Sequence, residues 1–104
     1  MTVYTSADWY VKPGREEDFC AEWHELTDIS VAEIDPEARV MLLRDREDPR
    51  HFRSFGEFIN EEAIVRWRDG TVFGHRLGLL SEMLEHAGTA LFDVVYSANM
   101  PELR

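Results

Sequence analysis

The stretch FRSFGEFINEEAIVRWRDGTVFGHRLGLLSEML, residues 52–84, decides the fold. Its first part, residues 52–59, is rich in aromatic side chains and predicts a strand that ends at Asn60, a favourable helix N-cap. Two glutamates follow Asn60, and negative charge in a first turn favours a helix because it complements the helix dipole. The dipeptide Asp69-Gly70 then interrupts the helix, so we expect two helical segments.

The second helical segment follows this break. Thr71 can cap it, and its apolar residues recur at steps of four, three and four, which is a helical period. These residues are Phe73, Leu77, Leu80 and Leu84. We therefore expect one long broken helix that ends at Gly88, a C-cap glycine, and a last strand over residues 89–97.

The residues before this stretch predict a strand, a helix and a second strand. Residues 2–12 alternate with a period of two, with aromatic side chains on both faces, and predict a strand that is covered on both sides. An acidic first turn opens a helix at residue 15 that ends near Glu33. Its apolar face should cover the sheet, and it consists of Phe19, Trp23 and Leu26. Residues 38–46 then form a hairpin with a third strand over residues 50–59.

The element order is therefore β-α-β-β-α-β, with the broken helix as the second helix. Two right-handed βαβ halves predict an α+β, ferredoxin-like fold, a four-stranded antiparallel sheet with two helices on one face. Residues 1–104 form a single domain, in which residues 98–104 are a polar tail. The other sheet face still carries apolar and aromatic side chains, so we expect a homodimer in which a second copy covers it.

Composition excludes several classes of function. The chain has 21 acidic and 11 basic residues and a formal net charge of -10, which opposes binding to nucleic acid or to an anionic membrane. No apolar run approaches the roughly 20 residues of a membrane span, and the N-terminus lacks a signal-peptide pattern. The single cysteine, Cys20, fits a reducing cytoplasm, which is the expected location.

No metal or nucleotide motif is present. The histidines are His24, His51, His75 and His86, and they are scattered over different predicted elements. The sequence has no HExxH, CxxC, P-loop or GxGxxG pattern. We therefore expect no dedicated metal site.

The segment SFGEFINEEAIVRWRDGTVFGHR, residues 54–76, resembles the antibiotic biosynthesis monooxygenase family of dimeric α/β barrels. The similar features are a strand that ends in an aromatic residue, an acidic step, a helix with a Trp-Arg pair, and then a Phe and a His. The order of elements on both sides also fits, so the resemblance covers nearly the whole chain. It implies a dimeric α/β barrel with a pocket between the sheet and the helices of each subunit.

The pocket that the resemblance implies would bind a small aromatic or hydrophobic molecule. The residues expected to bind this substrate come from three strands and the broken helix, and they are Trp9, Phe52, Phe58, Trp67, Phe73 and Tyr96. The same aromatic side chains could instead simply fill the core, and the sequence leaves this alternative open.

Four residues are candidates for chemistry in this pocket. His75 is the candidate acid-base group, because an imidazole near neutrality can move protons from a phenol or enol. Arg53 or Arg66 could stabilise an oxyanion, and Ser54 is a polar candidate on the third strand. A surface histidine and solvated arginines are the simpler interpretation of the same residues.

The resemblance also shows departures from the known reactions of the family. Where the cofactor-independent, quinone-forming members have an Asn and a Trp on the third strand, this chain has Ser54 and Phe58, and Ile64 replaces a Tyr on the helix. None of these three positions carries the residue that this reaction uses.

The haem-degrading members use an Asn, a Trp and a His. The corresponding residues here are Ala7, Phe58 and Leu77, and His75 lies two residues early. Haem is therefore a possible but disfavoured cofactor. The leading hypothesis is a monooxygenase that oxidises an aromatic or polyketide-like molecule without a metal, flavin or haem. The alternatives are a haem-binding or haem-degrading protein and a non-catalytic dimer that binds a small hydrophobic molecule.

Overall fold

The structure is a computed structural model that describes residues 2–99, apart from the side chains of residues 34 and 71–73. Its elements are, in chain order, β1 (Val3–Val11), α1 (Glu16–Ile34), β2 (Arg39–Arg44), β3 (His51–Phe58), α2 (Glu61–Arg68), α3 (Thr71–Glu82) and β4 (Leu84–Phe92). The predicted α+β, ferredoxin-like class is confirmed. The broken helix consists of two separate helices, α2 and α3, so three helices accompany the sheet.

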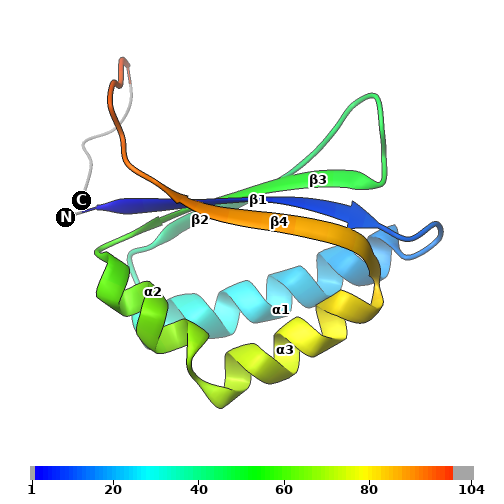
Figure 1. Cartoon of the computed structure of the whole chain (residues 1–104), viewed down its shortest axis with the longest axis horizontal. Coiled ribbons are helices and arrows are strands. Elements are labelled where there is room, and N and C mark those ends of the chain that lie inside the picture. The colour runs from blue at the N-terminus through cyan, green and yellow to red at the C-terminus, as the bar shows by residue number, and fades with distance from the viewer. Residues whose placement is uncertain (1, 100–104) are drawn as a thin grey trace.

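The sheet has the strand order β2-β3-β1-β4, and every neighbouring pair is antiparallel. Figure 1 shows that α1, α2 and α3 all lie on one face of the sheet, so none of the described helices covers the other face. We call the second face the open face. No helix among the described residues is long and apolar enough to cross a membrane.

The strand register assigns each side chain to one of the two faces. Ala7 pairs with Ser54 of β3 and with Thr89 of β4, so these three residues lie in one row on the helix-covered side. Asp8 pairs with Arg53 and Gly88, and this neighbouring row lies on the open face. The predicted alternation along β1 is confirmed by burial, because Val3, Ala7, Trp9 and Val11 are all buried.

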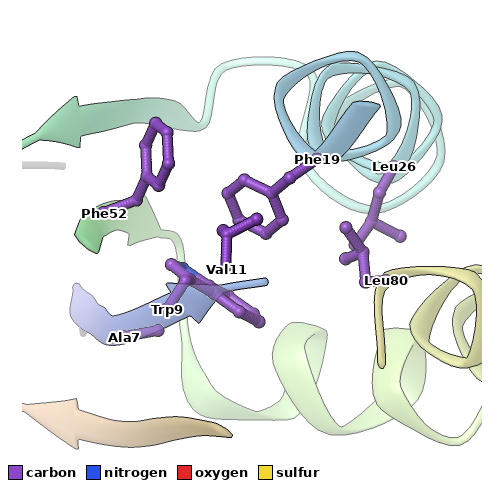
Figure 2. Packing of buried hydrophobic residues seen from close by; sticks show 7 residues of the cluster. All are labelled: Ala7, Trp9, Val11, Phe19, Leu26, Phe52 and Leu80. Carbon is purple, nitrogen blue, oxygen red and sulfur yellow. The ribbon is translucent and has the colours of Figure 1, made fainter. Parts of the chain in front are cut away.

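The main core lies between β1, β3 and the helices (Figure 2). The ring of Phe19 lies between those of Trp9 and Phe52, at centroid distances of 5.8 Å and 5.1 Å. Leu26 of α1 and Leu80 of α3 complete the core, and both are buried. The predicted apolar face of α1 is therefore confirmed.

The junction between α2 and α3 follows local sequence signals. The Asn60 side chain accepts a hydrogen bond from the backbone N–H of Ala63 at 2.9 Å, which confirms the predicted N-cap. Asp69 ends α2 and Gly70 is the N-cap residue of α3. The sequence predicted Thr71 as the cap of this segment. Thr71 is instead its first helical residue.

The predicted C-terminal boundary of the broken helix is wrong. α3 ends at Glu82, and Gly88 lies in the middle of β4 opposite Asp8. The predicted strand over residues 89–97 is displaced toward the N-terminus, and residues 93–97 have no regular structure. Pairing with β1 explains the difference. The N–H of Lys12 donates to the carbonyl of Met83 at 2.9 Å, which attaches the end of α3 to the end of β1.

Candidate functional site

A cavity of about 340 Å³ lies between the helix-covered side of the sheet and the helices. This volume is at the low end of the roughly 300–1,000 Å³ that small-molecule sites occupy. All seven elements contribute to its lining, which consists of Thr5, Ser6, Ala7, Trp9, Trp23, Leu26, Thr27, Ser30, Val31, Val40, Ser54, Phe55, Gly56, Phe58, Ile64, Trp67, Arg68, Leu77, Thr89, Ala90 and Leu91.

The cavity has a buried floor and an exposed rim. Ser54, Gly56 and Phe58 of β3 form part of the floor, and all three are buried. Thr89 of β4 and Arg68 of α2 are exposed, and they mark the side where the cavity meets solvent. A ligand can therefore enter between β4 and α2 while its far end is desolvated.

Trp9 and Ser54 join two strands across the floor. The indole Nε1–H of Trp9 donates to the Ser54 hydroxyl at 2.9 Å, and both residues are buried. A buried indole N–H needs such a partner, so this bond fixes the Trp9 ring. The hydroxyl of Ser54 keeps its own donor hydrogen and a second lone pair, which it can offer a ligand at the floor.

One face of α2 supplies a wall that ends in a positive charge. Ile64, Trp67 and Arg68 are spaced i, i+3 and i+4, so they share this face, and all three line the cavity. Ile64 is buried and Trp67 is half-buried, whereas Arg68 is exposed at the rim. Arg68 is the one charged side chain in the described lining, and no carboxylate of the described chain lies within ion-pair distance of it.

Sequence reasoning missed Arg68 as a candidate and considered Arg53 and Arg66 instead. Arg66 is exposed and does not line the cavity. The signal that could have found Arg68 is its position one helical turn after Ile64 and directly after Trp67, which was already predicted to line the pocket.

The structure brings four of the predicted site residues together. Trp9, Ser54, Phe58 and Trp67 all line the cavity. Phe52 does not line it, because its ring packs in the core against Phe19 and is 2% exposed. The substrate-binding prediction for Phe52 therefore has no support from its position.

Three other predicted residues lie away from the cavity. His75 is exposed on α3 and does not line the cavity, whereas Leu77 does. Residues two positions apart on a helix are rotated by roughly 200° about its axis, so the side chains of His75 and Leu77 point to opposite sides of α3. Tyr96 is 81% exposed and lies beyond the end of β4. Arg53 lies on the open face, and the side chain of Phe73 is outside the described part of the chain.

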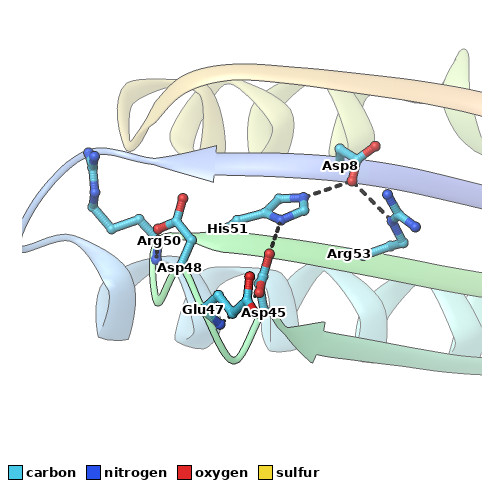
Figure 3. A network of polar contacts seen from close by, with 7 residues as sticks. All are labelled: Asp8, Asp45, Glu47, Asp48, Arg50, His51 and Arg53. Carbon is cyan, nitrogen blue, oxygen red and sulfur yellow. Dashed lines mark hydrogen bonds and ion pairs between the residues drawn. The ribbon is translucent and has the colours of Figure 1, made fainter.

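Arg53 belongs to a polar cluster on the open face (Figure 3). His51 lies between two carboxylates, with its Nδ1 3.0 Å from Asp45 and its Nε2 2.8 Å from Asp8. The Nε of Arg53 also donates to Asp8, at 3.0 Å. The hydrogen bonds that His51 makes to Asp45 and Asp8 favour its protonated form and raise its pKa above the ordinary value. The sheet separates this cluster from the cavity, so these groups do not contact a ligand there.

The donors in the cavity do not fit a metal or a ligated haem. No group of three or more His, Cys, Asp or Glu side chains that could hold a metal occurs within residues 2–99 as described. Haem iron is held in proteins by His, Cys, Met or Tyr side chains. The described lining contains none of these four residue types.

Comparison with known proteins places the chain in a family. The family model for antibiotic biosynthesis monooxygenases matches residues 2–75. The chain belongs to the antibiotic biosynthesis monooxygenase family. A search among curated proteins gave no match.

Several solved structures share the fold of this family member. SnoaB, a cofactor-independent oxygenase from Streptomyces nogalater, superposes with a TM-score of 0.85 at 16% identity, over 95% of this chain and 98% of SnoaB. A conserved protein from Methanosarcina mazei Go1 gives 0.78 at 17% identity, over 88% and 91% of the two chains. A structure described as an antibiotic biosynthesis monooxygenase gives 0.75 at 20% identity, over 90% and 99%. At these identities the likeness shows the fold alone.

Proposed function

We propose that this family member is a monooxygenase that oxidises a flat, electron-rich aromatic molecule in the cavity, without a resident metal, flavin or haem. The cavity is the observation that carries the proposal. Trp9, Trp23, Trp67 and Phe58 contribute to its lining, and aromatic side chains suit a planar conjugated ligand. Membership of the family and the fold shared with a cofactor-independent oxygenase support the same reaction class.

In the proposed reaction the substrate itself reduces oxygen. An anthrone-type phenol loses a proton to give an electron-rich anion, which transfers electrons to O₂ and forms a carbon–oxygen bond. One oxygen atom remains on the reacting carbon as a carbonyl group. The other leaves as water with the two hydrogens that this carbon carried, so no external reductant is consumed. The protein needs to stabilise the anion and to exclude bulk water.

We assign the stabilisation of the anion to Arg68. Its guanidinium group presents several N–H donors and can hold a phenolate or enolate oxygen at the rim. The described lining has no carboxylate or imidazole, so the substrate proton would leave to solvent at the exposed side. The role of His75 as the base stays a prediction that its exposed position on α3 does not support.

Arg68 can be tested against a matched neighbour. Arg66 lies on the same helix and is also exposed, but it does not line the cavity. We expect Arg68→Ala to lower oxygen uptake with an anthrone-type phenol by about 10²-fold, the scale of losing one oxyanion donor. Arg66→Ala should retain the rate. Equal rates in both variants would contradict the role of Arg68. Saturable binding of the phenol to the wild type without oxygen uptake would indicate a non-catalytic binding protein.

We also propose that a second copy of the chain covers the open face. The strand register places Met41, Leu43 and Phe92 on this face, where they are 54%, 46% and 52% exposed. The charges on the same face are paired, as in the Asp8–Arg53 ion pair at 3.0 Å. Apolar side chains with neutralised charges between them suit burial against an identical surface.

A further inference from the structure

Gly56 of β3 lies at the floor of the cavity. It pairs with Thr5 of β1 and with Val40 of β2, so it occupies an interior position of the sheet. Its backbone is outside the left-handed region, so a preference for that conformation does not explain the glycine. A glycine inside a strand also marks a place where other atoms approach the backbone closely.

The atoms that approach Gly56 belong to the Phe58 ring and to Thr5. A Cβ at position 56 would lie 2.7 Å from Cε2 of Phe58 and 2.8 Å from Oγ1 of Thr5. Both distances are shorter than an ordinary contact, which is about 3.5–4.0 Å between carbon atoms. The Phe58 ring therefore occupies the space that a side chain at residue 56 would need.

This arrangement determines how far the Phe58 ring extends into the cavity. The ring also packs with Val3 and Ile64, and all three residues are buried. Because buried side chains are closely packed, a ring displaced from Gly56 can move only toward empty space, and that space is the cavity. A methyl group at position 56 would thus reduce the depth of the cavity without changing its rim.

We propose that Gly56 and Phe58 together determine the size of the aromatic ligand. The glycine holds the ring back against the sheet and admits a ligand of three fused rings, whereas a larger residue at position 56 would admit two. This inference rests on the proposed function of the cavity and adds the specificity-determining pair to it.

The test compares two fluorescent probes that differ by one ring, 1-aminoanthracene and 1-aminonaphthalene. We expect the wild type to bind both. Gly56→Ala should weaken the binding of the three-ring probe by about tenfold or more, the effect of a small volume change in an apolar pocket. It should change the affinity for the two-ring probe by less than about twofold. Gly78→Ala is the control, because a Cβ at this exposed α3 position meets nothing within 4 Å.

A second variant separates a narrowed cavity from a damaged fold. Phe58→Leu removes the ring edge, so adding it to Gly56→Ala should restore three-ring binding to within about threefold of the wild type. The inference would be overturned if Gly56→Ala weakened the binding of both probes equally or of neither. It would also be overturned if the double variant did not regain three-ring binding. A wild type that binds neither probe would overturn it as well. The expected binding pattern without oxygen uptake would refute only the proposed reaction.

Discussion

The indole of Trp9 and the hydroxyl of Ser54 form a buried hydrogen bond of 2.9 Å that joins β1 to β3 beneath the cavity. Removing the acceptor leaves a buried donor unsatisfied. We expect Ser54→Ala to lower the free energy of unfolding by about 1–2 kcal/mol, measured by urea titration. In a Trp9→Phe background the same change should cost about 1 kcal/mol less, because the donor is already absent. The same cost in both backgrounds would show that the bond contributes nothing.

Substitution of Trp67 distinguishes a ligand-binding role of this side chain from a role in core packing alone. Its ring lines the cavity and also packs against the core, so Trp67→Ala should lower stability. If a flat aromatic ligand binds there, the same change should weaken its binding by about 1–3 kcal/mol, measured by calorimetry on the folded fraction. Phe52→Leu is the comparison, because Phe52 lies in the same core but does not line the cavity. It should lower stability and leave affinity unchanged. Identical affinities in both variants would mean that the aromatic residues only fill the core.

His51 should make stability depend on pH. Its pKa is raised in the folded state by the hydrogen bonds that it makes to Asp45 and Asp8, so the folded protein binds this proton more tightly than the unfolded chain. The stabilisation is fully present below the unfolded pKa of about 6.5 and is lost as the pH rises through the higher folded value. The pKa values of Asp8 and Asp45 are lowered, and the largest cause in each case is the hydrogen bond from His51. Their contribution is present above about pH 4 and is lost as the pH falls through their lowered values.

This dependence can be measured by urea unfolding between about pH 5 and pH 8, where histidines titrate. The wild type should lose stability relative to His51→Gln as the pH rises, since glutamine keeps polar contacts but does not titrate. His75→Gln is the control, because His75 is exposed and no carboxylate within residues 2–99 as described forms an ion pair with it. Parallel pH profiles for the wild type and His51→Gln would show that this cluster does not couple to folding.

The proposed dimer can be tested with two exposed apolar residues of similar exposure. Leu43 lies on the open face and is 46% exposed, whereas Val65 lies on α2 and is 45% exposed. We expect Leu43→Asp to shift the protein to monomers in sedimentation velocity runs, because it buries an unpaired charge at the interface. Val65→Asp should leave the dimer unchanged. A wild type that sediments as a stable monomer at micromolar concentration would contradict the proposal.

The parts of the fold that sequence predicted well are those with local signals. The Asn60 cap and the break at Asp69-Gly70 each depend on a few adjacent residues. The apolar spacing of α1 was equally reliable, because Phe19 and Leu26 bury the face that the period assigns to the core. These features need no knowledge of distant parts of the chain.

The last strand was misplaced because its position depends on a distant partner. Residues 92–96, FDVVY, have a stronger strand propensity than LEHAGTA at residues 84–90, yet β4 contains the second segment. Pairing with β1 outweighs local propensity there.

The candidate site shows the same contrast between residues placed by local patterns and residues placed by the packing of whole elements. The family resemblance located the pocket, and strand alternation and helical spacing then selected Trp9, Ser54, Phe58 and Trp67, which line it. The exposed position of His75 depends on the rotation of α3, which a break at Gly70 leaves undetermined in the sequence.

The central position of β1 has a consequence for how the chain folds during synthesis. β1 pairs with β4 from Tyr4 opposite Phe92 to Val11 opposite Leu84, so the first of the four strands to be synthesised pairs with the last. Such distant pairings carry a large loop-closure cost and slow the formation of a sheet. We expect a nascent chain that stops at Met83 to leave the β4-facing amides of β1 open to hydrogen exchange. The four-stranded sheet would then close only after β4 has been synthesised.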